Sequence, residues 1–460
     1  MIQMIRKGLL SFITAALLFT SCSSSDKLPE TNSKIEVQIE NLDDKLEVAK
    51  DKSLQFKAVI KSELESQFYW LLDGEVQAEA KDSIFTFTAA EVGDYKLTLK
   101  VTDIENEAEV SVDIHVFGQF RDGAFVLNEG QMGVLSSTLV FISPDGTATS
   151  DVYKKVNNRN LGNVTQDLFI AKDKIYFISQ NGADKSSDKS LPTDGILTIA
   201  NAETLEKIQS FEAEFEDRLS WPTHIAVPNE SNVFIRDGKG IHQFNPSSLE
   251  LNFVEGSERA TKITMAVVGN RVFAISGNKL IAMEAGVNKV VKTADFNSPI
   301  TGVLPSYDGK LWLAVNENSK PRILKVEPKS LDVIQENTIS VGALGRGWGA
   351  TSSITAKGDT IYYSNAETNI YRHIFSENKS TFLIDSRALV ENANMIYNTI
   401  AVDPTSGYLY QTTIKGFGQD YKSNNISIFN FNGDNPKLEK NLVNFTAFPA
   451  GTFFTANFNK

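Results

Sequence analysis

The chain has 460 residues, a formal net charge of −12 and a hydrophobic fraction of 41 %. This length allows two or three domains with cores of their own. The acidic balance argues against nucleic acid as a partner, because such binding needs a basic surface, and the single cysteine excludes an internal disulfide.

The first 21 residues are expected to be a signal peptide and not part of the fold. Arg6 and Lys7 precede an apolar run over residues 8–19, which is shorter than the roughly 20 residues of a membrane-spanning helix. Cys22 follows directly after two small residues. The pattern resembles the signal of bacterial lipoproteins, in the relaxed form found in the Bacteroidetes, which implies that Cys22 is lipidated. We expect an outer-membrane protein at the cell surface that touches the membrane only through its lipid anchor.

The segment after Cys22 is expected to be a tether followed by a β-sandwich. Residues 22–33 are polar and lack an apolar period. Residues 34–117 alternate polar and apolar positions in short runs separated by turn residues, which is typical of a sandwich. The predicted strands cover residues 35–39, 54–60, 68–71, 84–87, 95–101 and 110–116.

Two stretches of this segment resemble a PKD or immunoglobulin-like domain. They run from Tyr69 to Gly74 and from Gly93 to Asp103. The resemblance implies that Trp70 is the core aromatic between two sheets and that Tyr95 packs near the start of a late strand. Both roles concern packing, so no chemistry is assigned to this domain.

Residues 120–460 repeat weakly, with an apolar residue followed by an aromatic one in each repeat. The spacing is close to the ~40–50 residues of a four-stranded propeller blade. The seven aromatic positions are Phe125, Tyr176, Phe234, Phe273, Trp312, Tyr362 and Tyr410. The sequence therefore predicts an all-β chain with a seven-bladed β-propeller. Blade one lacks a first strand of its own, and we expect residues 452–458 to supply it and close the ring.

Candidate ligand-binding residues lie in the loops of one propeller face. On that face, the connections between second and third strands are predicted to be long in blades one, two and seven and short in blades three and four. The segments leading into the first strands share the face. Aromatic and amide side chains in these segments suit a large, neutral, partly apolar ligand. They are Asn128, Glu129, Gln131, Met132, Asn163, Gln166, Asp167, Gln180, Asn181, Trp221, His224, Arg346, Trp348, Asn394, Tyr397, Phe417 and Tyr421.

Other readings of these residues stay open. Trp221 and Tyr397 would also suit packing between blades, and the amides would suit turn capping. Glu129 and Asp167 could form a carboxylate pair of the kind that glycosidases use. No cofactor is predicted, because the histidines occur singly, outside any metal-ligand spacing, and the usual nucleophile motifs are missing.

The start of the propeller resembles a family of Bacteroidetes surface lipoproteins with YncE-like propellers. The resemblance rests on Asn128-Glu129-Gly130, on the segment from Gly162 to Asp167 and on the segment from Asp194 to Ala200. One branch, the BtuG-like lipoproteins, captures cobalamin and passes it to a TonB-dependent outer-membrane transporter. The resemblance thus implies a non-catalytic protein that captures a corrinoid or a similar small-molecule ligand. The alternatives are an adhesion or scaffold protein that binds a protein or glycan, and a lyase or glycosidase.

Overall fold

The computed structural model describes residues 34–183, 189–317, 320–345, 351–398, 400–433 and 436–457. The predicted signal peptide, Cys22 and the predicted tether lie outside these residues, as do Arg346 and Trp348. The chain divides into two compact units, a sandwich that contains most residues up to His115 and a propeller that contains the residues from Val116 onward. In the described part of the chain, no helix has the length and apolar character that crossing a membrane requires.

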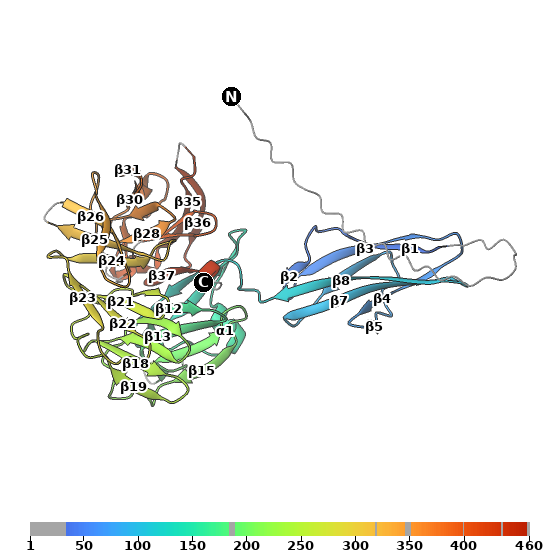
Figure 1. Ribbon diagram of the computed structural model, residues 1–460, viewed down its shortest axis with the longest axis horizontal. Coiled ribbons are helices and arrows are strands. Elements are labelled where there is room, and N and C mark those ends of the chain that lie inside the picture. The colour runs from blue at the N-terminus through green and yellow to red at the C-terminus, as the bar shows by residue number, and fades with distance from the viewer. Residues whose placement is uncertain are drawn as a thin grey trace, which may run out of the picture. The chain divides into compact units, whose positions relative to one another are not determined.

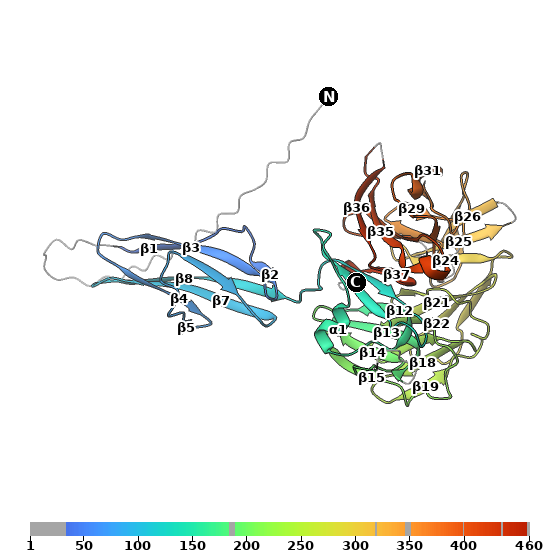
Figure 2. The same ribbon diagram turned by 180° about the vertical axis from the view of Figure 1, so that it is seen from behind.

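The first unit is a two-sheet β-sandwich (Figure 2). One sheet has the order β1-β3-β6 and the other the order β2-β8-β7-β4-β5. The strands are β1 Glu36–Asn41, β2 Glu47–Ala49, β3 Ser53–Lys61, β4 Gln67–Leu72, β5 Glu75–Val76, β6 Ile84–Thr88, β7 Gly93–Thr102 and β8 Glu107–Phe117. The short strands β2 and β5 were not predicted, because neither shows an alternating pattern of useful length.

The sandwich core follows from the alternation of its strands. In β3, every second residue from Leu54 to Ala58 is buried and the residues between them are exposed. Trp70 is fully buried, and its ring lies 5.3 Å from that of Phe85. Tyr95 packs on Phe87 with its ring centroid 5.4 Å away. Both predicted packing roles are therefore confirmed.

The second unit is a seven-bladed β-propeller, whose blades follow one another in chain order (Figure 1). Blade one holds β37, β9, β10 and β11, and the next five blades hold β12–β15, β16–β19, β20–β23, β24–β27 and β28–β31. Blade seven holds β32 and β33, which both pair with β34, followed by β35 and β36.

The strand bounds show four positions per blade. In blades one to three they are β9 Ala124–Asn128, β10 Thr138–Ile142, β11 Ala148–Thr149, β12 Asn163–Ala171, β13 Lys174–Asn181, β14 Leu197–Asn201, β15 Lys207–Phe211, β16 His224–Asn229, β17 Asn232–Arg236, β18 Ile241–Asn245 and β19 Glu250–Phe253. Blades four and five contain β20 Ala266–Val268, β21 Arg271–Ser276, β22 Lys279–Glu284, β23 Lys292–Asp295, β24 Ile300–Pro305, β25 Leu311–Glu317, β26 Lys320–Val326 and β27 Val333–Thr338. Blades six and seven contain β28 Ile354–Lys357, β29 Thr360–Tyr363, β30 Asn369–Ile374, β31 Lys379–Asp385, β32 Met395–Ile396, β33 Ala401–Val402, β34 Leu409–Ile414, β35 Asn424–Asn430 and β36 Lys437–Val443, and β37 is Pro449–Phe454.

The recurring aromatic residues occupy the second strand of each blade. Phe125, Phe234 and Trp312 are fully buried, since each packs between the sheets of two neighbouring blades. The fourth strands are more exposed, as in β27, where one residue of six is buried. The apolar-aromatic repeat is therefore the signature of the core layer between blades.

The C-terminal strand completes blade one. β37 pairs with β9 antiparallel, with Phe453 opposite Phe125, and Thr455 donates from its backbone N–H to the carbonyl of Gly123 at 3.1 Å. The predicted pairing is confirmed, although the strand covers Pro449–Phe454 and not residues 452–458. Figures 1 and 2 both place β37 beside β12 as well.

A short helix was missed by the repeat pattern. α1 (Val152–Asn157) joins blade one to blade two and buries Val152 and Tyr153 in their shared core. Elsewhere in the described residues, the short helical turns are η2 Ser386–Ala388, η3 Gly418–Lys422 and η4 Thr455–Asn457. These segments are too short for a helical period to appear in the sequence.

Candidate ligand-binding site

The connections between second and third strands differ greatly in length around the ring. They cover residues 129–137 in blade one, 182–196 in blade two and 415–423 in blade seven. In blades three and four they cover only residues 237–240 and 277–278. Because antiparallel strands alternate in direction, these loops share one face with the segments leading into the first strands. We call this side the loop face, and the predicted asymmetry of its loops is confirmed.

Glu129 lies on this face, directly after β9, and is 5 % exposed. Its Oε2 accepts a hydrogen bond of 3.3 Å from Tyr397 Oη, while its Oε1 is buried without a hydrogen-bond partner among the described residues. Burial raises the pKa of Glu129 to about 7, against the opposing effects of Lys262, Tyr397 and Gln166. A carboxyl group with such a pKa can exist in either protonation state near neutral pH.

The partners of Glu129 come from several blades. Tyr397 lies between β32 and β33 of blade seven, Gln166 lies on β12 of blade two, and Lys262 precedes β20 of blade four. Burial lowers the pKa of the half-buried Lys262. The positive charge of Arg236, at the end of β17 in blade three, acts in the same direction. Side chains from opposite sides of a ring can interact only near its axis. Glu129 therefore lies at the mouth of the central channel.

Aromatic rings extend from this carboxylate toward solvent. Tyr397 contacts Phe448 edge-on, with ring centroids 5.5 Å apart, and Tyr421 stacks on Phe448 at 4.9 Å. Phe417 and Met132, on the two neighbouring long loops, are 45 % and 47 % exposed. The arrangement offers apolar area next to a buried polar group, as binding sites for amphipathic small molecules do.

Two amides of β12 also retain buried atoms without partners. Neither Nδ2 nor Oδ1 of Asn163 has a hydrogen-bond partner among the described residues, and the same holds for Oε1 of Gln166. Between them, Val164 adopts a φ of 57°, which is unusual for a β-branched residue. Buried polar atoms without partners cost about 1–3 kcal/mol each, so their presence needs a reason such as a ligand or water.

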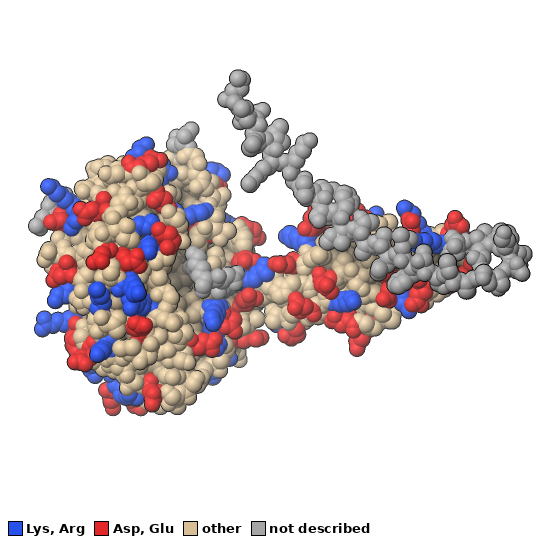
Figure 3. Space-filling view, viewed as in Figure 1, with Lys and Arg blue, Asp and Glu red and all other residues tan. Residues whose placement is uncertain are grey.

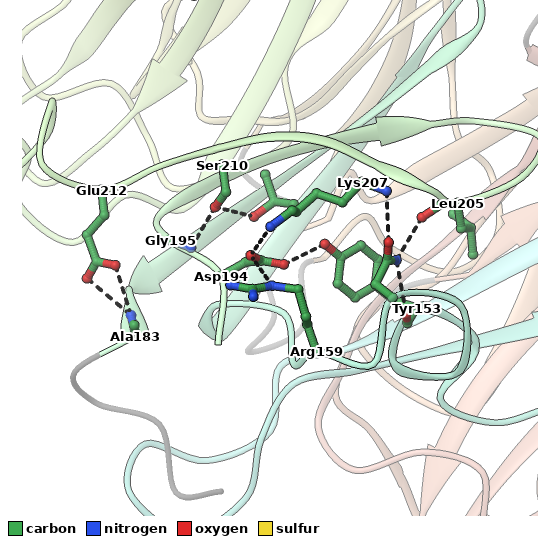
Figure 4. Close-up of polar contacts among 11 residues, drawn as sticks. Tyr153, Arg159, Ala183, Asp194, Gly195, Leu205, Lys207, Ser210 and Glu212 are labelled. Carbon is green, nitrogen blue, oxygen red and sulfur yellow. Dashed lines mark hydrogen bonds and ion pairs between the residues drawn. The ribbon is translucent and has the colours of Figure 1, made fainter. Parts of the chain in front are cut away.

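The blade-two loop is fixed to the scaffold at both ends (Figure 4). The carboxylate of Asp194, which is 1 % exposed, accepts from Tyr153 Oη at 2.6 Å, from Arg159 Nε at 2.9 Å and from Lys207 Nζ at 3.2 Å. At the other end, the backbone N–H of Ala183 donates to Glu212 at 3.1 Å. These contacts hold the described ends of the loop in place next to blade one.

A cavity of about 340 Å³ opens between the loop of blade one and the helix α1. Residues 134–139 form one wall, and Asp151, Tyr153, Lys154, Asn160 and Leu161 form the other. Its volume suits one moiety of a larger ligand. The cavity lies on the side of the propeller where the long loops gather.

Comparison with known proteins gives the family. A protein family described as "Domain of unknown function (DUF5074)" matches residues 122–455. The chain belongs to this family. No match was found among curated proteins.

Solved structures similar to this DUF5074 protein are propellers. One is described as a quinonprotein alcohol dehydrogenase-like protein from Bacteroides thetaiotaomicron VPI-5482, with a TM-score of 0.56 and 14 % identity over 89 % of this chain and 96 % of that chain. Another is a catalytically inactive virginiamycin B lyase from Staphylococcus aureus with quinupristin, with a TM-score of 0.42 and 12 % identity over 67 % of this chain and 92 % of that chain. At these identities the first likeness shows the fold alone.

Several predicted residues of the DUF5074 domain serve the scaffold. Asn128 donates to Thr138 and to the carbonyl of Phe445, which fixes the segment before β37. Asp167 is buried, and it accepts from the backbone N–H groups of Leu168 and Ile225. Burial raises the pKa of Asp167 to about 8, and neither Asp167 nor Glu129 is among the groups that shift the other's pKa. The two carboxyl groups therefore do not influence each other as the pair considered in the sequence analysis would.

The other predicted residues are distributed over the loop face. His224 is buried, with Nδ1 2.9 Å from Thr223 Oγ1, whereas Trp221 is 57 % exposed and does not pack between blades. The amide Nδ2 of Asn181 lies 3.6 Å from Met132 Sδ. Gln131 and Asn394 are exposed, and Gln180 is half-buried. Trp348 and Arg346 lie outside the described residues.

Three residues of the channel mouth were not predicted from the sequence. Phe448 directly precedes β37, which is the first strand of blade one. A search of the segments that lead into first strands, extended to blade one, could therefore have found it. Lys262 and Arg236 carry no local signal, because their role depends on the ring bringing blades three and four opposite blade one. Lys, Arg, Asp and Glu are interspersed on the visible face of the molecule, without a continuous basic patch (Figure 3).

Proposed function

We propose that this protein is a lipid-anchored, non-catalytic capture protein that binds a large small-molecule ligand on the loop face of blades seven, one and two. One observation carries the proposal. The long loops of three neighbouring blades surround a channel mouth where Glu129, Asn163 and Gln166 keep buried atoms without partners. Single buried atoms without partners also occur elsewhere in the propeller, for example at Trp312 and Ser386, so the binding role is supported by the presence of several such atoms at one group of neighbouring loops.

The ligand we propose is a corrinoid such as cobalamin, and the partner is a TonB-dependent outer-membrane transporter. This part rests on the resemblance of the segments around Asn128 and Gly162 to surface cobalamin-binding lipoproteins. The exposed Phe417 and Met132 support it, because a large macrocycle with an apolar face needs aromatic and apolar area next to polar groups.

Equilibrium binding of cyanocobalamin to residues 34–460 tests this function. We expect the washed protein to retain the absorption spectrum of the coloured ligand at a stoichiometry near one. Replacing Asn278, in the short loop of blade four, by Ala should leave binding unchanged. A colourless washed protein would rule out the corrinoid.

The anchor is tested separately from the ligand. Cys22→Ser should move the protein from the membrane fraction to the soluble fraction, because lipid chains on this residue would provide the only attachment. Thermal stability should stay the same, since Cys22 lies outside the two predicted domains, residues 34–117 and 120–460. Continued membrane association of the variant would contradict the lipoprotein assignment.

An adhesion protein is the second candidate, and a feature of the sandwich favours it. A cavity of about 510 Å³ lies beside β5 and β6, and Val76 and Ile84 on its walls are 57 % and 46 % exposed. Exposed apolar residues around a hollow are typical of interaction surfaces. The test compares glycan and protein binding by the unchanged protein and by the Val76→Asp and Ile84→Asp variant. Loss of binding in the variant would favour adhesion through the sandwich over ligand capture by the propeller.

A further inference from the structure

The neighbouring strands β9 and β12 bring together, at the loop face, buried hydrogen-bonding atoms that suit one chemical group. Glu129 Oε1, Gln166 Oε1 and Asn163 Oδ1 are acceptors, and Asn163 Nδ2 is a donor. None of them has a partner among the described residues, and the three side chains are 5 %, 5 % and 1 % exposed. Gln166 also acts on the carboxylate of Glu129 directly, so the two acceptors are neighbours.

We infer that the channel mouth binds a primary carboxamide, held by Glu129, Gln166 and Asn163. A carboxamide offers two N–H donors for the acceptor oxygens of Glu129 and Gln166 and a carbonyl for the Asn163 donor. The inference rests on the proposed capture function and names the group that the site recognises.

The charges around the mouth favour a neutral group over an ion. An ammonium group would bring a further positive charge close to Lys262 and Arg236, which already act on each other. A carboxylate would meet Glu129 and would lose its hydration in a buried site. A neutral amide avoids both costs, because it needs hydrogen bonds and no counter-charge.

The aromatic residues next to Glu129 would contact the part of the ligand that is attached to the carboxamide. Tyr397 holds the second oxygen of Glu129 and contacts Phe448, on which Tyr421 stacks. A ring attached to the carboxamide would therefore reach apolar surface as soon as it leaves the mouth. Benzamide, benzoate and benzylamine share this ring and differ only in the polar group.

Saturation-transfer NMR with these three probes and the full chain tests the inference. We expect benzamide to bind at millimolar concentration, and benzoate and benzylamine to bind at least about tenfold more weakly, as expected for a lost buried hydrogen bond or an added charge. Glu129→Gln and Gln166→Met should each weaken benzamide binding about fivefold to tenfold. Glu336→Gln is the matched control, since Glu336 lies on the outer strand β27 of blade five, where it pairs with Arg322, and its substitution should change nothing.

The pH dependence gives an independent readout. The titratable or charged groups that act on Glu129 are Lys262 and Tyr397, with Arg236 acting on Lys262. Above the Glu129 pKa of about 7 the carboxylate accepts from the amide, so benzamide should bind more tightly there than below it. This dependence should vanish in Glu129→Gln.

Each outcome decides the inference. Equal or tighter binding of benzylamine would show an ionic site, and absence of benzamide binding, or binding that ignores both substitutions, would overturn the carboxamide assignment. Failure of the capture function looks different. In that case benzamide would bind as expected while cyanocobalamin would not. If cyanocobalamin bound and benzamide did not, only the carboxamide assignment would fall.

Discussion

Blades one and three carry a carboxylate at the same position, directly after the second strand, yet the two carboxylates differ in their hydrogen-bond partners. Asp237 accepts from the backbone N–H groups of Ser220, Lys239 and Gly240 at 2.8, 2.8 and 2.9 Å. Glu129 accepts one hydrogen bond of 3.3 Å from Tyr397. Both side chains are buried, so the difference lies in their partners.

The loops explain the difference. Residues 237–240 form a tight turn whose backbone N–H groups point back at Asp237, whereas residues 129–137 form a wide loop. Burial alone would raise the pKa of Asp237, but hydrogen bonds from His242, Ser220 and Gly240 lower it. The pKa of Glu129 is instead raised to about 7. The short loop thus makes its carboxylate part of the scaffold, while the long loop leaves one oxygen of the equivalent carboxylate without a partner among the described residues.

The largest expected effect comes from removing the strand that blade one borrows. Truncation after Val443 deletes β37, so that β9 loses its partner and exposes a sheet edge. We expect the propeller to lose its cooperative thermal unfolding transition. Circular dichroism or calorimetry measures this transition. Blade three is continuous in sequence and has no such dependence. An unchanged melting temperature would mean that β37 is dispensable.

The second prediction concerns Asp237 itself. Asp237→Asn should lower the free energy of unfolding by about 3 to 5 kcal/mol, because the amide turns a donor toward N–H groups that need an acceptor. Chemical denaturation at neutral pH measures the change. A loss below about 1 kcal/mol would show that the tight turn holds without its carboxylate.

Glu129→Gln should act in the opposite direction. The folded-state pKa of about 7 lies above the ordinary value of 4.5, so the folded protein binds more protons between these values and loses stability as the pH rises through them. Gln cannot ionise, and the variant should therefore be more stable above pH 7 by up to about 3 kcal/mol. Below the ordinary pKa the two proteins should match. Equal stability at every pH would mean that Glu129 is solvated like a surface residue.

The smallest expected effect is on binding and comes from the exposed aromatic residues. Replacing Phe417 and Tyr421 together by Ala should weaken ligand binding by about 2 kcal/mol, which is typical for aromatic anchors. Stability should fall only slightly, by the stacking of Tyr421 on Phe448. The same measurement on Asn278→Ala provides the comparison across the ring. A larger loss there would make the long loops ordinary surface insertions.

Much of this architecture could be predicted because it depends on patterns within short segments of the sequence. The period-two alternation gave the sandwich strands, and the apolar-aromatic pair marked the second strand of each blade, where Phe125 and Trp312 are buried. The length of each loop could also be read from the spacing of strands. Even the pairing of β37 followed from the absence of a first strand in blade one.

Contacts between residues of different blades across the ring could not be predicted. They depend on the distances between blades in the folded propeller, which no local sequence pattern encodes. Asn128 and Asn163 both read as polar residues of the loop face, yet the first fixes the C-terminal segment and the second has no partner among the described residues. Lys262 lies far from Glu129 in the sequence and near it in the fold. Whether a buried polar residue is scaffold or site is decided by such contacts.

Hydrogen exchange measured by mass spectrometry, with and without saturating cyanocobalamin, tests the asymmetric site most directly. The account predicts protection of backbone amides in residues 129–137, 189–196 and 415–423, and no change in residues 237–240 and 277–278 of blades three and four. Protection centred on blades three and four, or none on the loop face of blades seven, one and two, would contradict it.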